Sequence, residues 1–274
     1  MTPEAGISLA KLTTIGTGGP ARAFARPSTV AELEEVLAWA AERALPVATV
    51  GLGSNLLAAQ LEHERVDTIV GGGAANAVCL HHARSAGLGG FEFACAIPGT
   101  AGGGVRMNAG AYGSDWSDIL VRVRVVAAEG DAWLTPSELG LSYRHSELRR
   151  GQVVAEVEYR LTPRPPDEIK LTVRELIAQR KATQPTNKRT FGSVFKNPEH
   201  ELGAGRMLEA CGLKGHAVGG AMISPMHANF IENAGGAATA DALALMAEAR
   251  RRAREQFGVE LEHEVQLLGG IAVT

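Results

Sequence analysis

The chain has 274 residues with a formal net charge of −3, and 45% of them are hydrophobic and 21% charged, which is typical of a folded globular protein. This balance leaves no basic surface for a polyanion, which argues against a nucleic-acid partner. Three cysteines without metal-like spacing argue against a disulfide framework or a zinc site. Since neither a signal peptide nor a run of about 20 apolar residues is present, we expect a cytoplasmic protein.

The first half of the chain predicts two helices among several short strands. Residues 29–43 fit a helix, because Thr29 and Glu32 form a capping-box pattern ahead of apolar residues at 3.6-residue spacing. Apolar or alternating runs elsewhere are typical of buried and half-buried strands. These strands are expected at residues 45–50, 66–70, 119–128, 131–135 and 153–162, with the second helix at 75–86. Residues 131–135 should be the hairpin partner of 119–128, and 153–162 should close a sheet.

A proline-rich segment at residues 162–167 predicts a linker, because proline fixes the backbone and cannot donate to a sheet. Beyond it the pattern predicts a helix at 170–183, a glycine-rich region at 184–234, a helix at 239–257 and a terminal strand at 261–268. We therefore predict a first domain at 1–163, with subdomains at about 1–57 and 58–163, and a second at 164–274. The last strand is a candidate to return to the first domain.

Two glycine-rich segments are candidates for ligand binding. Residues 47–56 lead from a strand into a glycine turn, where backbone amides can reach phosphate oxygens. The third glycine of a dinucleotide fingerprint is missing, however, so a turn without a ligand is an equally open interpretation. Residues 97–104 hold four glycines around Thr100, followed by Met107, Asn108 and Tyr112 at fixed intervals. This pattern favours a loop wrapped around a diphosphate or a flat ring over an unstructured loop.

The remaining candidate residues are polar and lie far apart in the sequence. Ser193 lies in the turn 192–198 without an acid–base histidine beside it, so it is better suited to give a proton than to attack a substrate. Arg144 could clamp a carboxylate, although a surface salt bridge would explain it as well. Glu262 and Glu264 would share one face of the terminal strand, with His263 on the other.

Taken together, these motifs resemble the UDP-N-acetylenolpyruvoylglucosamine reductases. The residues that carry the resemblance run in family order along nearly the whole chain: Thr14 with 18–21, 53–57, 97–100 with 108–113, Tyr143–Arg144, 192–198, 227–230 and Glu264–Val265. The chain looks like the short form of the family, without the loop whose tyrosine folds over the substrate. The resemblance implies an α+β protein with an FAD-binding fold of the vanillyl-alcohol-oxidase type in two subdomains, and a C-terminal α+β substrate domain.

The resemblance also implies the reaction. NADPH reduces a non-covalent FAD, and UDP-N-acetylglucosamine enolpyruvate is then reduced to UDP-N-acetylmuramate, with hydride from flavin N5 to C3 and a proton to C2. This step belongs to peptidoglycan synthesis, and so to cell-wall biogenesis, cell shape and division. A monomer without metal, membrane or nucleic-acid partners is expected.

The implied site residues fall into three groups. The catalytic residues are Ser193 as the proton donor, with Arg144 and Glu264 stabilising the substrate carboxylate. The implied cofactor-binding residues are Gly51, Gly53, Ser54, Asn55, Leu56, Pro98, Gly99, Thr100, Gly102, Gly103, Asn108, Gly110, Ala111 and Tyr112. The implied substrate-binding residues are Tyr143, Lys181, Lys196, Asn197, His227 and Asn229.

Two other interpretations stay open. A different flavin dehydrogenase of the same fold, acting on a small alcohol or hydroxy acid, would need neither the Ser193 turn nor Glu264. The second alternative is a flavin- or sugar-nucleotide-binding protein that has lost catalysis. It would fit the segment between Leu57 and Val66, which is shorter than the family leads us to expect. A strand and a turn would then be reduced or missing there. A serine hydrolase would need a nucleophile elbow and a paired histidine, which the sequence lacks.

Overall fold

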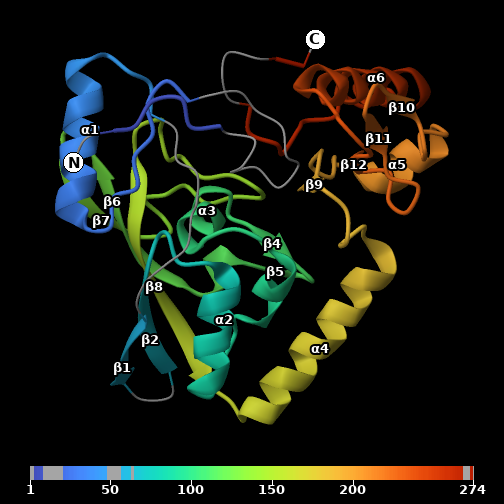
Figure 1. The fold of residues 1–274 in the computed structure, drawn as a ribbon. Coiled ribbons are helices and arrows are strands. Elements are labelled where there is room, and N and C mark those ends of the chain that lie inside the picture. Colours follow the sequence, from blue (N-terminus) through green and yellow to red (C-terminus); the bar gives the residue numbers. More distant parts are fainter. Residues whose placement is uncertain (1–2, 9–20, 48–56, 63–64, 268–271, 274) are drawn as a thin grey trace. The chain divides into compact units, whose positions relative to one another are not determined.

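The computed structural model describes residues 3–8, 21–47, 57–62, 65–267 and 272–273. The chain divides into two compact units, the first made of Met1–Pro3 and Ala25–Gln179 and the second of Glu4–Phe24 and Arg180–Thr274. Figure 1 shows the elements of both units along the chain. Each unit has a hydrophobic core of its own and is described by itself. None of the described helices is long and apolar enough to cross a membrane.

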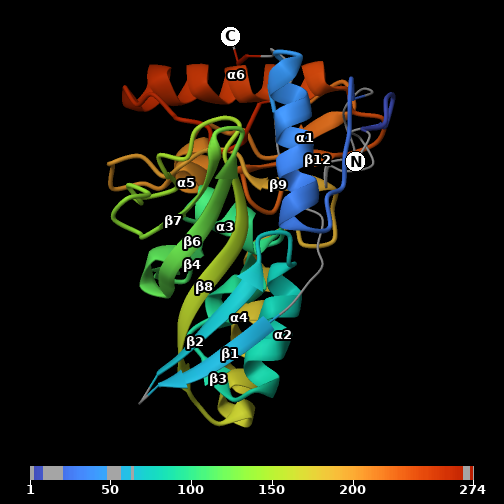
Figure 2. The same ribbon diagram turned by 90° about the vertical axis from the view of Figure 1, so that its left-hand side faces the viewer.

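An antiparallel sheet forms the centre of the first unit (Figure 2). Its strands, in spatial order, are β1 (Leu57–Glu62), β2 (Arg65–Gly71), β8 (Val153–Pro163), β6 (Leu120–Ala127) and β7 (Gly130–Leu134), with β3 (Leu88–Gly89) also paired to β8. The structure confirms the strands expected at 66–70, 119–128, 131–135 and 153–162, including the β6–β7 hairpin. The segment that the sequence expects to be reduced forms a hairpin, because β1 pairs with β2 from Leu57 to Glu62.

The helices of the first unit begin where the sequence provides a cap. Thr29 accepts a hydrogen bond from the Glu32 amide at the start of α1 (Val30–Glu42), which confirms this helix. The second expected helix is α2 (Asn76–Ser85), and a short α3 (Ala101–Arg106) follows it. Residues 45–47, where the sequence predicts the start of a strand, are not part of one, and 48–50 lie outside the described residues. The smaller elements are η2 (Glu92–Ala96), η3 (Trp116–Asp118), β4 (Gly110–Ala111) and β5 (Ser114–Asp115).

The core of the first unit is built around Trp116. Its indole is fully buried, donates from Nε1 to the Tyr159 hydroxyl at 2.8 Å and packs edge-on against Phe91 and Phe93. Burial raises the pKa of the Tyr159 phenol, so this hydroxyl acts only as a neutral partner. Gly104 of α3 lies directly against the indole, where a Cβ atom would collide with the ring. This close approach fixes the position of α3 on the sheet.

The proline-rich segment expected to be a linker is tied to the first unit. The Arg164 amide donates to the Gly87 carbonyl at 2.7 Å, and the Arg164 guanidinium donates to the buried Glu92 carboxylate at 2.9 Å. The following helix α4 (Pro166–Thr183) begins four residues before the expected 170, because proline is well suited to the first helical position, where its missing amide is not needed.

The second unit combines a four-stranded antiparallel sheet with helices, among its described residues. The strand order is β10 (Ala217–Val218), β11 (Ala221–Ile223), β12 (Phe230–Asn233) and β9 (Thr190–Ser193), and the helices are α5 (Ala204–Ala210) and α6 (Thr239–Phe257). Helix α6 has the predicted bounds and buries an apolar stripe that includes Leu245 and Met246. The terminal strand is wrong: of residues 261–267, only His263 forms a bridge, to Phe195. Alternation alone cannot supply a partner strand, and the paired stretch here is too short for a ladder.

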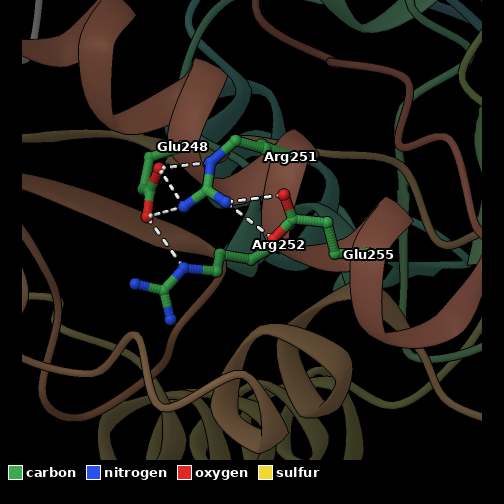
Figure 3. Close-up of polar contacts among 4 residues, drawn as sticks. All are labelled: Glu248, Arg251, Arg252 and Glu255. Atoms are coloured by element: carbon green, nitrogen blue, oxygen red, sulfur yellow. Dashed lines mark hydrogen bonds and ion pairs between the residues drawn. The ribbon is translucent and has the colours of Figure 1, made fainter.

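Polar side chains cap the start of α6 and pair along its outer face. Asp241 accepts from the amides of Ala238 and Gly220 at 2.9 and 3.0 Å, and these bonds lower its pKa. On the outer face, Glu248 accepts from Arg251 and Arg252, and Arg251 also reaches Glu255 (Figure 3). The arginines and Glu255 are largely exposed and Glu248 is half-buried, so solvent screens these pairs and they add little to helix stability.

The contact between Gly104 and Trp116 makes the first prediction. Gly104→Ala should lower the free energy of unfolding by about 1–3 kcal/mol, because the added methyl group must displace a fully buried indole. Gly103→Ala is the matched control in the same helix, since its methyl group would meet only Thr100 Oγ1 at 3.4 Å. Urea unfolding of both variants measures the difference, and equal stability would contradict this account of the core.

Candidate active site

The loop at residues 97–100 joins η2 to α3 in the first unit. Thr100 caps α3, accepting from the Gly103 amide at 3.3 Å. The amides of Ala101 and Gly102 donate to the carbonyls of Ala74 and Gly72 at 2.9 and 2.8 Å. The first amides of α3 therefore bind the protein's own backbone and are not available to a phosphate.

Gly102, a predicted cofactor-binding residue, is required for packing. A Cβ atom there would lie 3.0 Å from the Gly72 carbonyl oxygen and 3.2 Å from the Val154 Cβ atom. The glycine run of α3 thus has a structural cause in the close approach of this helix to β8.

Gly99 is the residue of this loop that leaves room for a ligand. It has a φ of +113°, and no atom of the described residues lies within 4 Å of the position that a Cβ atom would take. Within the described part of the chain, the amides of Gly99 and Thr100 donate no hydrogen bond. Open space beside two successive amides fits a group that brings acceptor oxygens close to the backbone, such as the FAD diphosphate.

Asn76 holds this loop from the first turn of α2, and the sequence reasoning missed it. Its amide donates to the Gly99 carbonyl at 3.0 Å and its Nδ2 to the Ile97 carbonyl at 3.2 Å. Its buried Oδ1 has no partner among the described residues, which is an unmet acceptor beside the loop. A signal exists in the sequence: Asn76 is a polar residue on the stripe of α2 that is otherwise Cys79, Leu80 and Ala83.

The hairpin β4–β5 follows α3. Its two-residue turn is Tyr112–Gly113, both with positive φ, and the Tyr112 hydroxyl donates to the Leu176 carbonyl at 3.0 Å. A Cβ atom at Gly110 would lie 2.6 Å from the Ser114 carbonyl oxygen, so glycine is needed for this pairing. Ala111, also a predicted cofactor-binding residue, is half-buried in β4.

Arg144 lies at the tip of a tight turn in the same unit. Its φ is +53°, its Nη2 donates to the Gly110 carbonyl at 2.6 Å, and its guanidinium lies 4.9 Å from the centre of the half-exposed Tyr143 ring. The structure thus brings Arg144 and Tyr143 to the hairpin that carries Gly110. The predicted cofactor-binding residues Gly51, Gly53, Ser54, Asn55 and Leu56 lie outside the described residues.

Ser193 ends strand β9 in the second unit. It pairs with Phe230 of β12 and follows Gly192, whose φ is +85°. The chain beyond it is clamped by the buried Asn229, which accepts from the Phe195 amide at 2.9 Å and donates to the Phe195 carbonyl at 2.8 Å. The Asn229 amide group is thereby committed to fixing the turn that carries Ser193.

The segment around Glu264 lies beside this turn. The Glu264 amide donates to the Val194 carbonyl at 2.8 Å, and the Lys196 amide donates to the Glu262 carbonyl at 2.9 Å. The sequence could not separate the two acids. Glu262 is exposed and pairs with Lys196 Nζ at 2.6 Å, whereas Glu264 is half-buried.

The other predicted substrate-binding residues differ in their surroundings. Asn197 accepts from the Ala204 amide at 3.0 Å at the start of α5. His227 accepts from the Asn229 amide at 3.2 Å, and burial, followed by the charge of Lys214, lowers its pKa. Lys181 is exposed near the end of α4. No cluster of metal-ligating side chains is present in the described part of the chain.

The sequence of this chain is similar to those of known proteins along most of its length. Residues 184–268 match the C-terminal domain of UDP-N-acetylenolpyruvoylglucosamine reductase, and residues 61–135 match an FAD-binding domain. The UDP-N-acetylenolpyruvoylglucosamine reductase of Anaeromyxobacter dehalogenans is 41% identical over 95% of this chain and 84% of that protein. The enzyme of that name from Bacillus velezensis is 38% identical over 96% of this chain and 92% of that protein. The chain belongs to the UDP-N-acetylenolpyruvoylglucosamine reductase family.

A solved structure from the same family agrees with the fold. The reductase from Thermus caldophilus is 33% identical, with a TM-score of 0.79 over 97% of this chain and 98% of that one. The predicted family, the α+β fold with an FAD-binding domain, and the class of FAD-dependent oxidoreductase are therefore confirmed. The roles of the individual site residues stay predictions.

The lowered pKa of His227 makes the second prediction. The unfolded chain binds a proton near the ordinary histidine pKa of about 6.5, whereas the folded state keeps His227 neutral to a lower pH. The neutral His227 therefore favours the folded state fully above the pKa of the unfolded chain. As the pH falls below that value, the unfolded chain gains a proton that the folded state does not bind, and stability is lost. Urea unfolding at pH 7.5 and 5.5 should show a smaller difference in His227→Asn than in the unchanged protein. An equal difference in both would contradict the neutral buried state.

Proposed function

We propose that the chain reduces UDP-N-acetylglucosamine enolpyruvate to UDP-N-acetylmuramate with NADPH as the reductant, in peptidoglycan precursor synthesis. The family membership supports the overall reaction. Bound FAD supplies the hydride chemistry, and the open backbone at Gly99 in the first unit fits its diphosphate. A cytoplasmic location and a monomeric state stay predictions of the sequence.

The roles of the site residues follow from what the reaction requires. Reduction of the vinyl group adds a hydride at C3 and a proton at C2, and we assign the proton to the Ser193 hydroxyl. Arg144 would hold the substrate carboxylate through charged hydrogen bonds, and Glu264, when protonated, would donate one to it. A serine hydroxyl is a weak acid, so its position must be fixed before the proton moves.

The observation that carries this assignment is the hydrogen bond between the Glu264 amide and the Val194 carbonyl. It brings an acid from the C-terminal part of the chain next to the residue after Ser193. The Asn229 clamp on Phe195 holds the same turn from the other side. Ser193 and Glu264 both belong to the second unit, and we assign the protonation step to that unit.

The overall reaction is tested with the purified protein and added FAD. Under anaerobic conditions NADPH should bleach the flavin absorbance, and UDP-N-acetylglucosamine enolpyruvate should restore it. Bleaching that the substrate does not reverse would rule out the proposed reaction. A protein that takes up no flavin would instead favour the binding protein that has lost catalysis.

The role of Ser193 makes the third prediction. Ser193→Ala should leave flavin reduction by NADPH unchanged and slow reoxidation by the substrate by about 10²–10⁴-fold, the usual contribution of a general acid. Stopped-flow absorbance measures the two half-reactions separately. Ser193→Cys retains a proton donor and should keep more activity than Ser193→Ala. If reoxidation is equally fast in all three proteins, Ser193 is not the proton donor.

A further inference from the structure

The turn that carries Arg144 has a strained backbone. Ser142 and His145 exchange two hydrogen bonds of 3.1 Å each and enclose Tyr143 and Arg144 at the tip. The φ of +53° at Arg144 is in the left-handed region, which is unfavourable for a residue with a side chain. Strain of this kind persists only where neighbouring structure enforces it, and it is a recurrent feature of functional sites.

Three alternate residues hold this turn, namely the last residue of α3 and two residues beyond it. The Arg106 carbonyl accepts from Ser146 Oγ at 2.6 Å, on one side of the turn. The Gly110 carbonyl accepts from the Arg144 guanidinium at 2.6 Å. Asn108 lies between these two positions and donates from Nδ2 to the Ser142 carbonyl at 3.0 Å, on the other side of the turn.

Arg106 extends this attachment to the chain beyond the turn. Its half-buried guanidinium donates to the carbonyls of Leu148, Arg149 and Gln152 at 3.2, 3.1 and 2.8 Å. The turn and the chain that follows it therefore lie against the same segment, residues 106–110. Within that segment, Asn108 reaches the turn through its side chain.

The side chain of Asn108 is fully engaged within the protein. It is 3% exposed, and besides the Ser142 carbonyl its Nδ2 donates to Asp115 Oδ2 at 3.2 Å. Its Oδ1 accepts from the Ser117 amide at 3.1 Å. Both amide hydrogens are thus used, which argues against a direct bond from Asn108 to the cofactor. Its φ of +36° is one that asparagine tolerates better than most residues.

We propose that Asn108 is a positioning residue for Arg144. Its carboxamide links the Ser142 carbonyl to Asp115 and Ser117, so the strained turn takes its position from the β4–β5 hairpin and η3. The Arg144 side chain extends from that turn, and its guanidinium is held at its far end by the Gly110 carbonyl. The inference deepens the proposed function, because it rests on Arg144 holding the substrate carboxylate.

The first test measures the turn without reference to activity. Asn108→Gly removes the carboxamide and keeps a residue that accepts a positive φ. Hydrogen–deuterium exchange of the peptide covering residues 142–148 should be faster by at least about tenfold, because the turn loses a buried hydrogen bond. Glu92→Gln is the control, since it weakens an ion pair of the same unit that does not touch the turn. Unchanged exchange in Asn108→Gly, or equal acceleration in the control, would overturn the proposal.

The second test couples Asn108 to Arg144 in the reaction. Asn108→Gly should raise the KM for the enolpyruvyl sugar nucleotide by about tenfold or more, with flavin content and bleaching by NADPH unchanged. In an Arg144→Gln background the same change should alter KM by less than about twofold, since the guanidinium it positions is gone. An equal change in KM with and without Arg144→Gln would show that Asn108 has a merely structural role. Loss of flavin from Asn108→Gly would show that Asn108 binds the cofactor. Either result overturns the proposal. If the unchanged protein does not reduce the substrate at all, the proposed function fails, and the exchange measurement still decides on the positioning.

Discussion

The close contact of α3 with Trp116 and β8 is the constraint on which the first unit depends. Gly104 lets the helix touch the indole, and Gly102 lets it approach the backbone and Val154 of β8. The loop at residues 97–100 leads into α3 at one end, and the segment that holds the Arg144 turn leaves the helix at the other. A shift of this six-residue helix would therefore move the loop and the turn together.

In the second unit, a buried side chain rather than a helix contact fixes the candidate site residues. Here a single buried side chain, Asn229, satisfies both the amide and the carbonyl of Phe195, and so fixes the chain just after Ser193. The Glu264 segment then adds itself to that fixed chain through main-chain bonds. Backbone hydrogen bonds of this kind fix the position of the residue without depending on its side chain.

The comparison with the sequence shows where local patterns are sufficient. Helix α6 has its predicted bounds, because its apolar stripe and the glycine at position 258 are both local signals. The prediction of a terminal strand was wrong because a strand needs a partner, and the sequence of 261–268 carries no information on which residues would pair with it. The proline-rich composition predicts a linker, yet Arg164 ties this segment to Glu92, a contact between residues far apart in the chain.

For the glycines and asparagines of the candidate site, the sequence again predicts the region, while contacts with distant residues decide the role of each residue. The run at 97–104 predicted a loop close to a ligand, and Gly99 has the open backbone that such a loop needs, while Gly102 and Gly104 are glycines because of packing. Asn108 was expected at the cofactor and is engaged with the Arg144 turn, while Asn76, which was not expected, leaves an unmet acceptor by the loop. An asparagine looks the same in either role until its neighbours are known.

By itself, the sequence determined the family, the chemistry and most helices and strands, because motif order and hydrophobic periodicity are written along the chain. Only the tertiary structure decided which glycines serve packing, which of the two C-terminal acids lies beside Ser193, and which residues hold the Arg144 turn. Each of these depends on a contact between segments that are distant in sequence. Such a contact is set by the packing of the whole unit and leaves no local pattern from which it could be predicted.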